Sequence, residues 1–196
     1  MRADLDIIND WIQPNSRVLD LGCGNGELLQ HLIGDKQVQG YGIEIAADNI
    51  NRCIEQGIPV LEQDIDNGLH NFGDQSFDLV VMTHALQQFR RPDLLLDEML
   101  RVGKECIITF PNFGHWRNRL HLGIKGRMPV SEFLPYNWYD TPNIHFCTFV
   151  DFKRLCQEKG ITIKRWAAVD GQLRDYWWIR AMPNVMSETA IFHVSR

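Results

Sequence analysis

Over the first 110 residues, strand-length apolar segments alternate with segments whose apolar residues recur at helical spacing. The strand-length segments are residues 17–21, 38–45, 59–63, 77–82 and 105–110. The segment at 77–82 is apolar almost throughout, as expected for a strand at the centre of a parallel sheet that is covered on both faces. This alternation predicts an α/β fold with a doubly wound, mostly parallel sheet.

Helices are predicted at residues 3–12, directly after Gly26, at 46–56 and from Pro92 to about 102. In the second of these, Leu28, Leu29, Leu32 and Ile33 share one face, and Gly34 stands where a helix-ending glycine is expected. In the third, Ile50, Cys53 and Ile54 are predicted to face inward.

The pattern changes after residue 110. Residues 111–147 contain few periodic segments but many aromatic residues, prolines and basic residues, among them Trp116, Arg117, Trp138 and Tyr139. Their aromatic content argues against disorder, so we predict a cap insertion over the carboxyl ends of the strands. A helix at 148–160, which Thr148 and Asp151 would cap, and strands at 161–166 and 190–194 complete seven strands in a single domain, 1–196. Residues 167–188 are expected to be a second, partly ordered insertion.

Glycines follow the first predicted strand at every second position: Gly22, Gly24 and Gly26. They allow the backbone to approach a ligand closely, beside the free N–H groups of the next helix. The dinucleotide fingerprint G-x-G-x-x-G is not met, because Glu27 occupies the last position and its carboxylate would repel a pyrophosphate. Asp20 before the turn suits a ligand that carries an ammonium or sulfonium group. This D-x-G-x-G-x-G sequence resembles motif I of the class I S-adenosylmethionine-dependent methyltransferases.

The resemblance implies further contacts with S-adenosylmethionine. Glu44, beside Ile45, follows Gly22 by 22 positions and would accept from the ribose hydroxyls. Asp64 would accept from the adenine amino group, while Ile65 covers the ring. Two alternatives stay open here: Glu44 as an exposed carboxylate at a strand end, and Asp64 as a turn residue.

The loop after the strand at 77–82 would lie under the methionine part of the cofactor. Its candidates for contact are Thr83, His84 and, with them, Gln87. His84 is alternatively a hydrogen-bonded loop histidine. No catalytic residue is assigned, because nothing in the spacing distinguishes His84 from other polar candidates in the cap insertion: His115, Tyr136 and His145.

Composition narrows the function further. A net charge of −5 argues against general nucleic-acid binding, and no apolar run is long enough to span a membrane. The five cysteines are odd in number and scattered, which indicates reduced thiols in a cytoplasmic protein. No metal site is predicted, because the histidines and Cys147 of the cap insertion lack the spacing of zinc ligands.

Four segments are not general to methyltransferases: residues 110–117, 126–129, 135–139 and 141–145. Together with the glycine motif and the length, they resemble the bacterial methionine-biosynthesis family MetW. That resemblance implies a methyltransferase-like fold whose seventh strand is antiparallel. It also implies a homoserine O-acyltransferase as the protein partner in methionine synthesis.

Two hypotheses follow. In the first, the chain binds S-adenosylmethionine or S-adenosylhomocysteine and acts as an accessory or regulatory subunit of the acyltransferase. In the second, it is a methyltransferase whose small-molecule substrate lies under the cap insertion. The Asn-Pro-Pro-Tyr motif of amino-group methyltransferases is absent after the strand at 77–82. Family resemblance favours the first hypothesis, and a fold alone does not establish methyl transfer.

Overall fold

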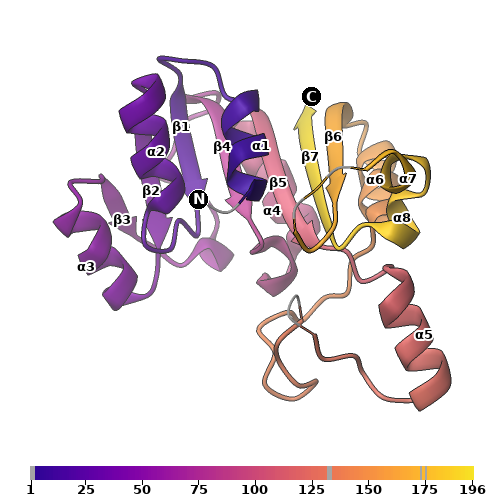
Figure 1. Ribbon diagram of the computed structural model, residues 1–196. Helices are drawn as coiled ribbons and strands as arrows, with labels where there is room; N and C mark the ends of the chain where they lie inside the picture. The colour runs from indigo at the N-terminus through magenta and orange to yellow at the C-terminus, as the bar shows by residue number, and fades with distance from the viewer. Residues whose placement is uncertain (1–2, 132–133, 173, 175) are drawn as a thin grey trace.

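The computed structural model describes residues 3–131, 134–172, 174 and 176–196. Within them, a seven-stranded sheet has the order β3-β2-β1-β4-β5-β7-β6, and β7 runs antiparallel to both of its neighbours (Figure 1). The strands are β1 (Arg17–Leu21), β2 (Gln39–Glu44), β3 (Val60–Glu62), β4 (Phe77–Thr83), β5 (Gly103–Pro111), β6 (Thr162–Val169) and β7 (Thr189–Ser195). The predicted fold class and the antiparallel last strand are therefore confirmed.

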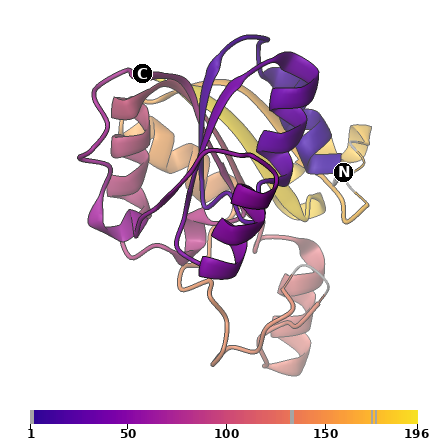
Figure 2. The ribbon, with the colours of Figure 1, turned by 90° about the vertical axis from the view of Figure 1, so that its left-hand side faces the viewer.

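Helices cover both faces of the sheet (Figures 1 and 2). Apolar residues of α1 (Ala3–Trp11), α2 (Glu27–Lys36) and α3 (Ala47–Glu55) form one core cluster with Val18 and Val81 of the sheet. A second cluster packs α4 (Pro92–Val102) and α6 (Phe149–Glu158) against Leu19, Val80 and other strand residues. Neighbouring residues of one strand thus enter opposite clusters, as the two-residue period of a strand requires.

Two details of the predicted helices are wrong. Helix α2 continues through Gly34 and ends at Lys36; the capping residue Gln37 has a φ of 54° and donates its N–H to the carbonyl of Leu32. The Lys36 ammonium donates to two carbonyls of the α1 region, Asn9 and Ile12, and so holds the last turn in place.

The second error concerns which apolar residues face the core. Ile33 is 36% exposed and Ile54 is 62% exposed, although both are spaced for an inner face. Cys53, which directly precedes Ile54, is fully buried as predicted. Ile54 belongs to α3, which lies near the edge strand β3, where the sheet is too narrow to cover the whole apolar face of the helix.

The cap insertion contains a helix that the pattern did not predict. Helix α5 (Trp116–Lys125) stands away from the sheet, beyond the carboxyl end of β5 (Figure 1). Gly126 ends it with a φ of 61°, and its N–H donates to the carbonyl of Leu122. After the insertion, Thr148 and Asp151 form the predicted capping box at the start of α6.

Two buried amides fasten the insertion to the domain. The Gln87 side chain donates to the carbonyl of Pro111 at 3.1 Å and to that of Cys147 at 3.4 Å, so it joins both ends of the insertion. Asn112 accepts from the backbone N–H groups of Gly114 and Phe149 and donates to the carbonyl of Ser187. These contacts lie across the insertion's base, and α5 extends beyond them.

The segment 167–188 is partly helical, with α7 (Trp177–Ala181) and α8 (Pro183–Met186) leading into β7. All five cysteines are free thiols, and Cys147 is the one that is half-buried. None of the described helices combines the length and the apolar composition needed to cross a membrane.

Candidate functional site

A cavity of about 490 Å³ opens at the carboxyl ends of β1, β2 and β4. This is the edge at which open α/β sheets bind ligands. Seven residues predicted as cofactor contacts line it: Gly22, Glu44, Ile45, Asp64, Ile65, Thr83 and His84. The remaining lining residues are Asn49, Gln63, Asp66, Ala85, Gln88 and Phe89. No described residue of the cap insertion is among them.

Glu44 is held firmly at the end of β2. Its Oε2 accepts from the N–H of Gly24 at 2.9 Å, and its Oε1 accepts from the N–H groups of Ile45 at 2.7 Å and Ala46 at 2.9 Å. The residue is 8% exposed. The carboxylate therefore connects the glycine turn to the start of α3, and its orientation is set before any ligand binds.

The three glycines of the turn are all in the left-handed region, with φ values of 71°, 56° and 79° for Gly22, Gly24 and Gly26. A side chain at Gly26 would stand 2.5 Å from Cδ1 of Ile58, which follows α3, and 3.1 Å from the sulfur of Cys53 in α3, so close packing requires glycine here. A side chain at Gly24 would meet open space. Neither Gly24 nor Gly26 lines the cavity, and their contact with a cofactor stays a prediction.

Asp20 is 1% exposed and lies beneath the turn, in register with Gly42 of β2 and Val81 of β4. It is not part of the cavity lining. Burial, assisted by the negative charge of Asp20, raises the pKa of the Cys23 thiol far above its ordinary value. Cys23 is therefore a protonated thiol and not a nucleophile.

Asp64 has a structural task as well as a place in the lining. It precedes a short 3₁₀ turn, Ile65–Asn67, and its Oδ1 accepts from the N–H of Asp66 at 3.0 Å. This is the turn role that the sequence left open. Its other oxygen accepts from the side chain of Asn67 at 3.3 Å, and the adenine contact stays a prediction.

The loop after β4 begins with an unusual backbone. His84 has a φ of 53°, and its N–H donates to the carbonyl and hydroxyl oxygens of the buried Thr109. Those bonds tie the loop to β5. Gln87 does not line the cavity, because its amide is directed at the base of the cap insertion.

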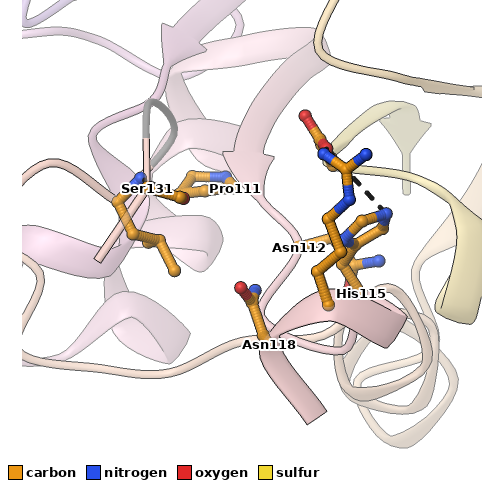
Figure 3. A pocket seen from close by; sticks show the side chains of 8 residues that line it. Pro111, Asn112, His115, Asn118 and Ser131 are labelled. Carbon is orange, nitrogen blue, oxygen red and sulfur yellow. Dashed lines mark hydrogen bonds and ion pairs between the residues drawn. The ribbon is translucent and has the colours of Figure 1, made fainter. Parts of the chain in front are cut away.

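A second, smaller cavity of about 120 Å³ lies at that base, between β5 and α5 (Figure 3). Its lining residues are Pro111, Asn112, His115, Arg117, Asn118, Ser131, Leu134 and Glu188. His115 Nε2 and Arg117 Nη1 lie 3.9 Å and 3.7 Å from Oε1 of Glu188. Burial, and secondarily the charge of Arg117, lowers the pKa of His115 to about 4, so its imidazole is neutral near pH 7.

Sequence reasoning named His115 but not Glu188. The two residues are far apart in the chain, and a glutamate just before a strand carries no signal of its own. The antiparallel pairing of Pro111 with Thr189 brings them together.

The family profile described as methionine biosynthesis protein MetW matches residues 2–194. The chain belongs to the MetW family. A bifunctional methionine biosynthesis protein MetXA/MetW from Rhodopirellula baltica is 35% identical to it over 208 aligned positions, which cover 98% of this chain. The MetW-family chain spans 33% of the length of that relative.

Solved structures resemble the MetW-family chain in fold. A SAM-dependent methyltransferase from Archaeoglobus fulgidus has a TM-score of 0.72 at 18% identity and covers 100% of this chain and 92% of its own. One from Mesorhizobium loti has a TM-score of 0.71 at 16% identity, covering 99% and 98%. The [4+2]-cyclase SpnF scores 0.71 at 18% identity, covering 100% and 81%. At these identities the likeness establishes the fold alone.

Proposed function

We propose that the chain binds S-adenosylmethionine or S-adenosylhomocysteine in the larger cavity and acts with, or regulates, a homoserine O-acyltransferase of methionine biosynthesis. The observation that carries the nucleoside part is the fixed Glu44 carboxylate in the cavity wall. The cavity's volume of about 490 Å³ lies within the ~300–1,000 Å³ typical of small-molecule sites.

The charge of the lining supports the same ligand class. Three carboxylates line the cavity, from Glu44, Asp64 and Asp66, and no lysine or arginine is among its described lining residues. Such a wall attracts a sulfonium or ammonium group and repels the phosphates of NAD. Hydroxyl and amino groups of a nucleoside are donors that these carboxylates can accept.

The R. baltica relative supports the partner. Its name joins MetXA and MetW in one bifunctional protein, and this chain matches 33% of its length. Joining two activities in one chain holds them at high effective concentration, which favours those that work together. We take the MetXA part to represent the acyltransferase with which this chain would associate.

A small-molecule methyltransferase is the second candidate, and the fold of the structural neighbours favours it. Of its candidate bases, His84 lines the larger cavity and His115 lines the smaller one. One observation weighs against it. No described residue of the cap insertion lines the larger cavity, so a substrate bound there would not lie under the insertion as that hypothesis requires.

Calorimetry on the purified chain tests the nucleoside part. S-adenosylmethionine or S-adenosylhomocysteine is expected to bind more tightly than NAD, and Gly24→Val is expected to abolish binding. Tighter binding of NAD would contradict the proposal. Co-purification of tagged chain with its own organism's homoserine O-acyltransferase, followed by an acyltransferase assay, tests the partner part. An acyltransferase that forms no complex and is fully active alone would leave the methyltransferase candidate standing.

A further inference from the structure

Helix α5 has an apolar stripe that the described residues of the domain leave exposed. Trp116, Leu120 and Ile124 recur every four residues on one face of the helix and are 41%, 52% and 73% exposed. Within this ten-residue helix, no residue is buried. In Figure 1 the helix is anchored at its first turn and otherwise stands clear of the sheet.

The surroundings of the stripe are basic. Residues 112–131 contain no Asp or Glu, and their four charged residues are Arg117, Arg119, Lys125 and Arg127, of which Arg117 faces the Glu188 carboxylate at 3.7 Å. The whole chain has a net charge of −5, so this segment is a positive projection from an acidic protein. Charge of one sign beside an apolar stripe steers a partner of opposite charge onto it.

A free helix of this length has little stability of its own. Isolated helices shorter than about 12–15 residues are marginal in water, and most of their stability in proteins comes from packing an apolar face. Here that face meets solvent, while a clustered exposed apolar surface is typical of interaction sites. An amphipathic helix of this kind binds by placing its i, i+4 and i+8 residues in a groove.

We infer that α5 docks through Trp116, Leu120 and Ile124 into an apolar groove with an acidic rim on the acyltransferase. This inference rests on the proposed function, because it specifies the contact surface of the partner named there. Trp116 and the guanidinium of Arg117, 5.5 Å from its ring, supply the residue types that dominate interface energetics. Trp138 and Tyr139 of the same insertion are also exposed, at 74% and 71%, and are of the residue types enriched at interfaces.

The test compares two faces of one helix. Leu120→Glu combined with Ile124→Glu places two negative charges in the stripe, while Leu122→Glu places one on the opposite face, where Leu122 is 44% exposed. We expect the double variant to bind the purified acyltransferase at least tenfold more weakly than wild type, and Leu122→Glu to bind within twofold of wild type. Both variants are expected to keep wild-type affinity for S-adenosylhomocysteine, which verifies folding.

The outcomes separate the inference from the function on which it rests. If wild type binds the acyltransferase and the double variant binds equally well, the docking surface is wrong and the proposed function stands. If wild type does not bind, both fail. Two further measurements test other partners of the stripe. Sedimentation of the chain alone tests a second copy of the chain, and flotation with phosphatidylserine vesicles tests a membrane. Self-association or vesicle binding that only the double variant loses, with acyltransferase binding intact, would assign the stripe to a second copy or to a membrane instead.

Discussion

Oε2 of Glu44 accepts a 2.9 Å hydrogen bond from the backbone N–H of Gly24, so the end of β2 is joined directly to the glycine turn after β1. The same carboxylate accepts two N–H groups at the start of α3. One side chain therefore sets the relative positions of three segments around the cavity. A change at Glu44 affects both the shape of the cavity and its charge.

Glu44→Gln tests this double role. The glutamine amide can accept through one atom only, so at least one backbone N–H would face an NH₂ group and lose its partner. We expect unfolding free energy to fall by about 1–3 kcal/mol, and affinity for S-adenosylhomocysteine to fall by a similar free energy. Urea denaturation and calorimetry measure the two effects. Wild-type values in both would contradict the connecting role of the carboxylate.

The glycine turn allows a second prediction with an internal control. Gly24 and Gly26 both have left-handed φ values, so alanine at either costs about 1–2 kcal/mol of backbone strain. At Gly26 the new Cβ would also lie 2.5 Å from Ile58 and 3.1 Å from the Cys53 sulfur. We expect Gly26→Ala to lose about 1–3 kcal/mol more stability than Gly24→Ala in urea denaturation. Equal losses would mean that α3 shifts freely away from the turn.

The sheet could be predicted from the sequence because its signals are local. The apolar segments at 17–21 and 77–82 have strand length, and the first is followed by glycines at every second position and then by apolar residues at helical spacing. The structure keeps these elements and places Glu44, Asp64 and Thr83 around one cavity. Parallel strands bring their carboxyl ends to one edge, so residues that follow different strands are neighbours there.

What the sequence could not supply depends on contacts between distant segments. Helix α5 is short, exposed and followed by proline-rich chain, so its stripe at 116, 120 and 124 cannot be distinguished from scattered apolar residues. Gly34 is the local signal for the end of α2, but the helix continues to Lys36, whose ammonium bonds the distant carbonyls of Asn9 and Ile12. The pairing of His115 with Glu188 requires the β5–β7 register.

The buried His115 predicts a pH effect on stability. Its pKa is about 4 in the folded protein against about 6.5 when unfolded, because burial and Arg117 disfavour the charged form. The unfolded state therefore binds a proton first, and stability present above pH 6.5 is lost as the pH falls toward 4. We expect His115→Gln to reduce this loss by about 2 kcal/mol between pH 7 and pH 4.5.

Denaturation of wild type and His115→Gln at matched pH values isolates this contribution from that of the carboxylates, which titrate in both proteins. Glu188, at 3.9 Å, favours protonated His115 and opposes the effect of burial. If wild type gained stability relative to the variant on acidification, the Glu188 pair would dominate and the assigned direction of the pKa change would be wrong.

Asn112 provides the last prediction, because its single side chain holds the base of the cap insertion. Its Nδ2 donates to the carbonyls of Asn184 and Ser187 at 3.1 Å and 2.8 Å, and its Oδ1 accepts from Gly114 and Phe149. Asn112 is 2% exposed, so removing its side chain leaves buried polar groups that water does not readily reach. We expect Asn112→Ala to lose about 2–4 kcal/mol of unfolding free energy.

Asn118→Ala is the matched control, because the Asn118 side chain makes one long hydrogen bond of 3.4 Å to the Phe113 carbonyl. We expect this variant to lose about 0.5 kcal/mol or less of unfolding free energy. Because no described residue of the cap insertion lines the larger cavity, Asn112→Ala is also expected to weaken acyltransferase binding more than S-adenosylhomocysteine binding. Denaturation and the two binding assays, performed well below the unfolding temperature, measure this separation. Equal losses in both assays would mean that the base of the insertion supports the nucleoside cavity as well.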